Sequence, residues 1–132
     1  ALYFIVIFIG SGTLIAGIIG ISNIMIFVIK ERTKEFGIRK ALGAQPSSIV
    51  GMVVQESVLI TTIAGYLGLS LGTYILSKIG NSLEDYFITN PSVSPGIVIG
   101  ATVVLVLSGL IAGYLPAKRA ANIKPIVALR AD

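Results

Sequence analysis

The sequence predicts an all-α membrane protein in which three transmembrane helices are combined with a short cytoplasmic helix and a helical C-terminal tail. Three observations lead to this fold class. Of the 132 residues, 55 % are hydrophobic and only 12 % are charged, about half the ~25 % charged share of a typical soluble domain. The uncharged residues form three long runs, and the Lys and Arg residues lie mainly between and after these runs. Too few charges are left to cover the surface of a soluble domain.

The residue types that are missing from the sequence exclude several kinds of functional site. The chain contains no Cys and no His, which excludes disulfide frameworks, Cys/His zinc sites and catalytic triads that need His. The net charge is +4, and because the few charges flank apolar runs, membrane topology explains this excess better than nucleic-acid binding does. No residue pattern indicates a catalytic residue or a metal site.

Each of the three apolar runs is long enough to cross a membrane. The first covers residues 2–29 without a charge, and the third covers residues 97–115, also without one. The second covers residues 47–77 and contains a single charge, Glu56. A bilayer core about 30 Å thick needs roughly 20 helical residues. We therefore expect one transmembrane helix in each run.

The segments between the spans predict the orientation of the chain. Residues 30–46 and the tail, residues 116–132, together carry nine Lys and Arg, whereas residues 78–96 carry one. Because such residues are enriched on the cytoplasmic side, we expect the first segment and the tail in the cytoplasm, and the loop 78–96 and Ala1 outside it. A start at Ala1 on the outer side, without an initiator Met or a charged leader, indicates the C-terminal part of a longer protein. The alternative is a small protein whose own N-terminus lies outside.

Small residues spaced four apart predict where the helices pack. In lipid, apolar side chains gain little from meeting each other, so the close approach of backbones favours association. The alternative is that Gly is simply frequent in membrane helices, and the spacing does not indicate whether packing occurs within one subunit or between two. The three ridges are Gly12, Ala16 and Gly20; Ala64, Gly68 and Gly72; and Gly109 and Gly113.

Glu56 is the only charged residue inside an apolar run. Its place in the second span, roughly 13 Å from the start at 1.5 Å per residue, is near the cytoplasmic border rather than the midplane. An intramembrane carboxylate is a functional candidate. The alternative is a side chain that reaches the interface or pairs with the basic segment before the span. No second acidic residue and no His lies in any run, which argues against a proton relay.

Residues 30–44 predict a short amphipathic helix. Glu35 and Arg39 form a favourable i,i+4 pair. Gly43 is suited to end this helix, and Pro46 can begin the next one. Such a helix either lies on lipid headgroups or fits a groove in a partner.

The C-terminal tail predicts two short helical segments at the membrane surface. Pro116 can occupy the first position of one segment, and Pro125 the first position of the other. The tail either anchors the topology by its basic residues or makes a second contact with a cytoplasmic partner.

Two segments carry a resemblance to a known family. Residues 31–44 read ERTKEFGIRKALGA, and residues 115–130 read LPAKRAANIKPIVALR. Both resemble segments of FtsX-like permeases of the MacB type, in the right order and with two spans between them, so the resemblance covers essentially the whole chain. Phe36 stands where such proteins often carry Ile, and Asn122 where a basic residue is common.

The resemblance implies four membrane helices with a large extracytoplasmic domain after the first, so this chain would hold helices two to four. Residues 30–44 would form the coupling helix that docks on an ABC ATPase. The permease would act as a homo- or heterodimer in the bacterial cytoplasmic (inner) membrane, in some relatives with a periplasmic adaptor. ATP-driven dimerisation of the ATPases would move the helices and rearrange the extracytoplasmic domains. The expected contacts with the ATPase are the apolar Phe36, Ile38 and Leu42 and the polar Arg32, Glu35 and Arg39.

The chain lacks the phosphate-binding pattern G-x-x-x-x-G-K-[ST], so we expect no ATPase activity and no cofactor in this chain. ATP and Mg²⁺ would bind to an ATPase on a separate chain or further upstream. The leading hypothesis is therefore a permease subunit that passes ATP-driven motion to an extracytoplasmic domain, for export or lipoprotein release. The alternatives are a membrane regulator that gates an extracytoplasmic cell-wall hydrolase, and a stand-alone channel or secondary transporter.

Overall fold

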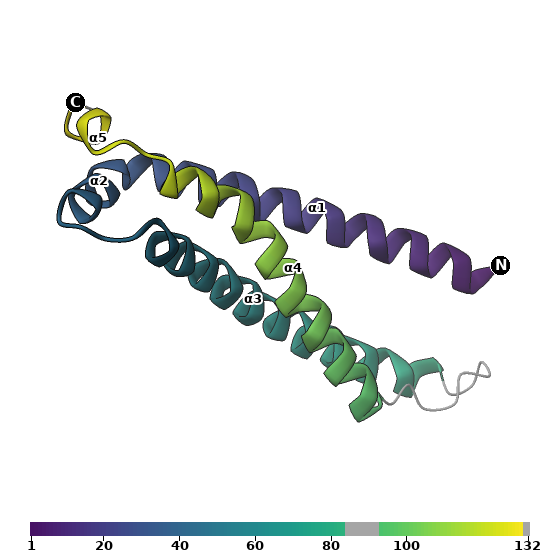
Figure 1. The fold of residues 1–132 in the computed structure, drawn as a ribbon. Helices are drawn as coiled ribbons and strands as arrows, with labels where there is room; N and C mark the ends of the chain where they lie inside the picture. Colours follow the sequence, from purple (N-terminus) through teal and green to yellow (C-terminus); the bar gives the residue numbers. More distant parts are fainter. Residues whose placement is uncertain (84–92, 131–132) are drawn as a thin grey trace.

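The computed structural model describes residues 1–83 and 93–130, and all regular elements in these two ranges are helices. Helices α3 and α4 lie side by side, and α1 meets them at one end and diverges from them toward its own N-terminus (Figure 1). An all-α fold with three long apolar helices confirms the predicted fold class. The elements are α1 (Leu2–Glu31), α2 (Thr33–Ala41), α3 (Pro46–Leu83), α4 (Pro95–Ala121) and α5 (Pro125–Arg130).

Three of these helices are long and apolar enough to cross a membrane: α1, α4, and α3 over Pro46–Gly80. Little of their apolar surface is buried within the chain. In the most apolar stretch of α1 no residue is buried, and in that of α4 only 17 % are. A helix satisfies its own backbone hydrogen bonds, so these exposed apolar surfaces are suited to lipid or to other membrane helices.

Two helices are longer than the apolar runs predict. Helix α3 continues to Leu83, so residues 78–83 belong to the helix and not to the expected loop, and residues 84–92 of that loop lie outside the described part. Helix α4 continues to Ala121, so the prediction that Pro116 begins a new helix is wrong. Pro116 and Ala117 are both buried, and this packing holds the helix together past a residue that cannot donate a backbone hydrogen bond. Pro125 does begin α5, as predicted.

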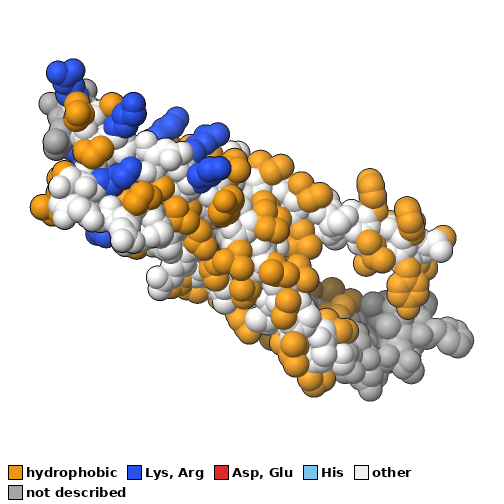
Figure 2. Space-filling view, in the orientation of Figure 1, with side chains coloured by type: hydrophobic (Ala, Val, Ile, Leu, Met, Phe, Trp, Pro, Cys, Tyr) orange, Lys and Arg blue, Asp and Glu red, His pale blue; other side chains and the backbone are white. Residues whose placement is uncertain are grey.

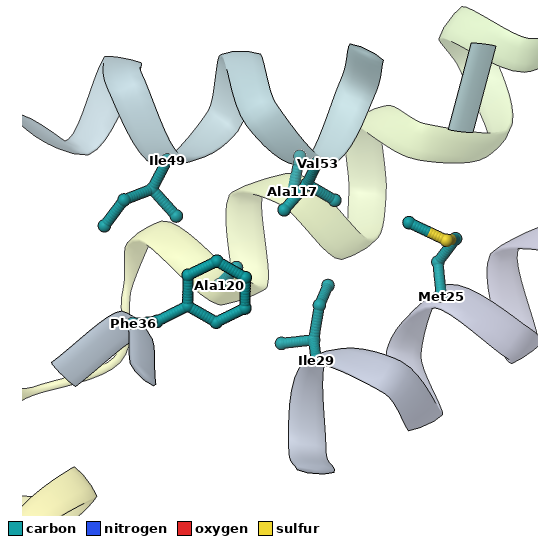
Figure 3. Packing of buried hydrophobic residues seen from close by; sticks show 7 residues of the cluster. All are labelled: Met25, Ile29, Phe36, Ile49, Val53, Ala117 and Ala120. Atoms are coloured by element: carbon teal, nitrogen blue, oxygen red, sulfur yellow. The ribbon is translucent and has the colours of Figure 1, made fainter. Parts of the chain in front are cut away.

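The apolar core lies at one end of the molecule, where α1, α2, α3 and α4 meet (Figure 3). We call this region the charged end, because Lys and Arg side chains gather on it, whereas hydrophobic side chains cover the spans (Figure 2). At the opposite end, which we call the far end, residues 1–17 of the chain are all exposed. The core side chains are Met25, Ile29, Phe36, Ile49, Val53, Ala117 and Ala120.

Two glycines of α4, Gly109 and Gly113, pack directly against α3. A Cβ added to Gly113 would lie 2.7 Å from the Cβ of Ser57, and one added to Gly109 would lie 3.0 Å from the Cα of Val58. The close approach also lets the Ser57 hydroxyl donate a 3.0 Å hydrogen bond to the carbonyl of Gly109. The third small-residue ridge therefore packs within the chain.

The other two ridges have no neighbour in the described structure. Apart from the neighbouring residues and backbone of the same helix, no described heavy atom lies within 4 Å of a Cβ built at Gly12 or Gly20 of α1, or at Gly68 or Gly72 of α3. Ala16 and Ala64 are likewise exposed. Between α1 and the α3–α4 pair, an apolar groove of about 410 Å³ remains open.

Candidate functional site

The candidate site is α2 and its contacts at the charged end. The chain bends between α1 and α2 at Arg32, whose backbone (φ −94°, ψ 14°) ends one helix and begins the next. The Thr33 hydroxyl donates hydrogen bonds to the carbonyls of Ile29 at 3.0 Å and Lys30 at 2.8 Å. Hydroxyl bonds of this kind to the preceding turn favour bends in helices. The single helix expected over residues 30–44 is therefore split between the end of α1 and α2.

Helix α2 ends just before Gly43, as the sequence predicts. Gly43 has a φ of 95°, a conformation that costs glycine little and other residues considerably more. The amide of Ala44 then donates to the carbonyl of Arg39 at 3.0 Å. Pro46 begins α3, also as predicted. The turn between them reverses the chain, so that α3 runs in the direction opposite to α1 (Figure 1).

Four charged side chains, which we call the elbow cluster, connect α2 to α3. Arg32 makes a two-pronged contact with Glu35, with its Nε 3.0 Å from Oε2 and its Nη2 3.3 Å from Oε1. Its Nη1 donates to Oε2 of Glu56 at 3.1 Å. Arg39 Nη2 donates to Oε1 of Glu35 at 2.8 Å. Glu56 is thus paired with the basic segment that precedes its span. Of the two interpretations left open by the sequence, this is the paired carboxylate.

The cluster also affects the protonation of α2. The hydrogen bond from Arg32 and the charges of Arg32 and Arg39 lower the pKa of Glu35, although partial desolvation opposes them. The hydrogen bond to Glu35 raises the pKa of Arg32, with the negative charges of Glu35 and Glu56 adding to it against some desolvation. Opposite charges within hydrogen-bonding distance favour the charged forms, so the Arg32–Glu35 pair is ionised at neutral pH.

The position of Phe36 corrects one of the ATPase contacts predicted from the sequence. Its side chain is only 2 % exposed and belongs to the core of the charged end, while the guanidinium of Arg32 lies over its ring, 5.5 Å from the centroid. Phe36 is therefore an internal anchor of α2 and not part of its outer surface. Ile38 and Leu42, in contrast, are 49 % and 82 % exposed, so they remain available to a partner.

Two further contacts of α2 were missed by the sequence analysis. The ammonium of Lys40 donates hydrogen bonds to the carbonyl of Ala121 and, at 2.9 Å, to that of Ile123, where a cation is favoured by the end of α4. Arg39 Nη1 lies 2.8 Å from the sulfur of Met52 in α3. The carbonyls that Lys40 contacts lie 81 and 83 residues further along the chain, and no local pattern signals such a pairing.

These contacts define the arrangement of α2. Its inner face packs into the core, Arg32 and Arg39 connect it to α3, and Lys40 connects it to the end of α4. Its outer face presents two large apolar side chains. Together with the three apolar spans, this arrangement defines a multi-pass membrane protein that carries a short helix fixed across one end.

The comparisons with known proteins agree with this class. A family model described as FtsX-like permease C-terminal matches residues 6–125, nearly the whole chain, and the chain therefore belongs to the FtsX-like permease family. It is 37 % identical over 120 residues to the macrolide export ATP-binding/permease protein MacB of Nitrosomonas europaea. It is 40 % identical over 119 residues to YknZ, an uncharacterised ABC transporter permease of Bacillus subtilis, and 37 % identical over 123 residues to an uncharacterised ABC transporter permease of Methanocaldococcus jannaschii.

The alignments cover most of this chain but only a part of each relative. They include 91 % of the chain and 18 % of the Nitrosomonas protein, 89 % and 29 % for the Bacillus protein, and 91 % and 31 % for the Methanocaldococcus protein. The chain thus corresponds to a permease segment of ABC transporter proteins of the FtsX and MacB type, as the resemblance predicts.

Proposed function

We propose that this chain is the membrane part of an ABC system and that it receives the motion of a cytoplasmic ATPase at α2. The observation that carries the proposal is the arrangement of α2, which is buried on its inner face, connected on both sides and apolar on its outer face. A groove on the ATPase would take up Ile38 of α2 and Leu42, which directly follows α2; both are large, exposed apolar side chains.

The contacts of α2 give a physical route for this motion. Because Phe36 is packed in the core, and because Arg32 pairs with Glu56 while Lys40 bonds to the end of α4, α2 cannot shift without moving the ends of α1, α3 and α4. Stiff helices then carry a displacement at the charged end to the far end. In the proposed orientation, with α2 and the C-terminus in the cytoplasm and the Ala1 side outside, the far end lies beside an extracytoplasmic domain.

The relatives support the proposal of an ATPase partner that carries the cofactor. The name of the Nitrosomonas relative includes both ATP-binding and permease functions, whereas the sequence of this chain has no phosphate-binding loop pattern. We therefore place ATP and Mg²⁺ in an ATPase, on the same or a separate polypeptide. The output that we propose is export or lipoprotein release across the cytoplasmic membrane. In the regulator alternative, the same membrane mechanism would gate a cell-wall hydrolase instead.

The docking proposal is tested by substitution of Leu42 in the full-length protein with its ATPase. Leu42→Asp places a charge in the proposed contact, and Leu42→Met is the matched control that keeps the apolar surface. We expect Leu42→Asp to abolish co-purification of a separate ATPase, or cross-linking to a fused one, with membrane insertion unchanged. Wild-type association of the Leu42→Asp protein would overturn the proposal. Arg39→Glu is a less selective test, because it also breaks the elbow cluster.

The second part of the proposal concerns a second permease copy. The ridges of α1 (Gly12, Ala16, Gly20) and α3 (Ala64, Gly68, Gly72) allow close helix approach, and a Cβ built at any of their glycines meets open space in the described structure. We propose that these ridges pack against a second copy or an upstream helix of the parent protein. Mass spectrometry of the proteins that co-elute with the full-length protein in mild detergent tests the assembly, since an adaptor favours export and a hydrolase favours the regulator.

A further inference from the structure

A small pocket at the charged end has an apolar lining and a basic rim. Its volume is about 180 Å³, and it lies where the end of α1, the start of α2 and the segment after α4 come together. Among the described residues, no acidic side chain contributes to its lining. The lining residues are Ile26, Ile29, Lys30, Thr33, Arg119 and Ile123.

The two cations of this pocket, Lys30 and Arg119, differ from the two arginines of the elbow cluster. Arg32 and Arg39 are neutralised by Glu35 and Glu56. Among the described residues, the side chains of Lys30 and Arg119 have no carboxylate or hydrogen-bond partner. Two neighbouring cations repel each other, and an anion between them relieves this repulsion. An arginine and a lysine together suit a phosphate group, because Arg offers paired N–H donors and Lys a mobile point charge.

The position of the pocket indicates where that phosphate comes from. Lys30 directly follows the uncharged residues 2–29, and Arg119 lies in the last turns of α4, beyond the apolar run 97–115. The pocket is therefore at the level at which both spans leave the hydrocarbon, which is the level of lipid headgroups whichever way the chain is oriented. Below the cations, Ile26 and Ile29 provide the apolar surface that the start of an acyl chain needs.

We propose that this pocket binds one anionic phospholipid, with its phosphate between Lys30 and Arg119 and an acyl chain along Ile26 and Ile29. Basic pockets between transmembrane helices are recognised sites for anionic headgroups. The bound lipid would connect α1 to the end of α4 next to α2, and so reinforce the charged end. This inference depends on membrane insertion and not on docking of an ATPase.

The test uses the full-length protein in its assembled state, purified in mild detergent and incubated with equal amounts of phosphatidylglycerol and phosphatidylcholine. Native mass spectrometry then measures how much of each lipid stays bound. We expect wild-type protein to retain one phosphatidylglycerol per chain in preference to phosphatidylcholine. The variant Lys30→Gln/Arg119→Gln should bind phosphatidylglycerol on the order of tenfold more weakly, since each basic residue near anionic lipid contributes appreciably to binding.

The matched control is Lys118→Gln/Lys124→Gln, which removes the same charge from the same end of the molecule but from outside the pocket lining. We expect this control to retain lipid as the wild type does. Equal loss in both variants would reduce the effect to a general basic surface and overturn the site. Unchanged lipid retention in the pocket variant would also overturn the site. A wild-type protein that shows no preference for phosphatidylglycerol would overturn it as well, which is the result expected if another part of the parent protein covers the pocket.

Discussion

The two ends of this molecule are built in opposite ways from the same helices. At the charged end, four helices enclose a core that includes Phe36 at 2 % and Val53 at 1 % exposure. At the far end, α1 diverges from α3 and α4 (Figure 1), and its Phe4 is 79 % exposed. One end is stabilised by contacts within the chain. At the other end, α1 is left to lipid or other helices, and an open groove of about 410 Å³ separates the middle of α1 from the middle of α3 and α4.

This difference teaches how a permease segment can combine stiffness with mobility. Side-chain packing and ion pairs connect α2 to the spans at the charged end, and in the proposed function a displacement there would be shared by all three spans. At the far end, α1 has few contacts to break, and contact-poor regions are the ones that move most easily. The predictions below test this contrast, and each compares a residue of one kind of region with a matched residue of the other.

The largest effect is expected from two phenylalanines in opposite environments. Phe36→Ala removes a buried side chain and should lower the free energy of unfolding by about 3–5 kcal/mol. Phe4→Ala removes one that is 79 % exposed, and its effect should stay within about 0.5 kcal/mol. Unfolding of the purified full-length protein in detergent measures both. Equal effects would contradict the contrast between the ends, whereas a large effect of Phe4→Ala alone would mean that the far end is the better packed one.

A smaller effect is expected from the glycine ridges. Gly113→Val would place its side chain against Ser57 of α3, and such overpacking typically costs about 1–3 kcal/mol. At Gly68, an added Cβ has open space around it in the described structure, so Gly68→Leu should leave the stability of the chain itself unchanged. It should instead weaken association with a second copy or an upstream helix. Thermal unfolding and the dimer content by light scattering separate the two effects. Unchanged dimer content and stability in Gly68→Leu would argue against the role of that ridge.

The pairing of Arg32 with Glu56 is expected to contribute less. Both side chains are partly exposed, at 37 % and 42 %, and exposed ion pairs contribute about 0.2–1 kcal/mol in double-mutant cycles. The cycle consists of Arg32→Gln, Glu56→Gln and the double variant, measured by unfolding at low salt. A coupling energy in this range that falls as salt is added would agree with the structure. Strict additivity of the two single variants would show that the contact is not formed in solution.

The smallest effect is the pH dependence of the elbow. Because the folded protein lowers the pKa of Glu35, the carboxylate stabilises the fold above its unfolded pKa, which is about 4.3 for a model Glu. This stabilisation is lost as the pH falls through the lower folded pKa. The melting temperature of the wild type should therefore drop more than that of Glu35→Gln when the pH is lowered below about 4. Parallel pH profiles for the two proteins would contradict the Arg32–Glu35 contact.

The sequence predicted the spans and the turn after α2 because those features are local. Apolar run length determines the helices, and Gly43 and Pro46 determine the turn between α2 and α3. Helices α3 and α4 were both predicted too short. Polar residues can continue a helix beyond the bilayer, and in α4 the packing around Pro116 outweighs the local effect of this proline.

The candidate site was predicted in outline but not in its details. The sequence pattern located α2 and the i,i+4 pair of Glu35 with Arg39, but it assigned Phe36 to the outer surface. An amphipathic pattern shows that a helix has an apolar side, and it does not show which of two apolar groups faces the rest of the chain. The partners of Lys40 and Glu56 depend on tertiary folding, which brings distant segments together.

The central claim is that α2 moves together with the charged end while the far end opens or closes. Pulsed electron resonance distances in the full-length protein test this claim, with spin labels on introduced cysteines and an excess of unlabelled protein to suppress distances between copies. One pair is Ala41 with Gln55, at the charged end, and the other is Ile5 with Ile99, at the far end; all four positions are exposed and lie outside the proposed ATPase contact. The account predicts that ATP leaves the first distance unchanged and changes the second. A changed first distance with a constant second distance would contradict it.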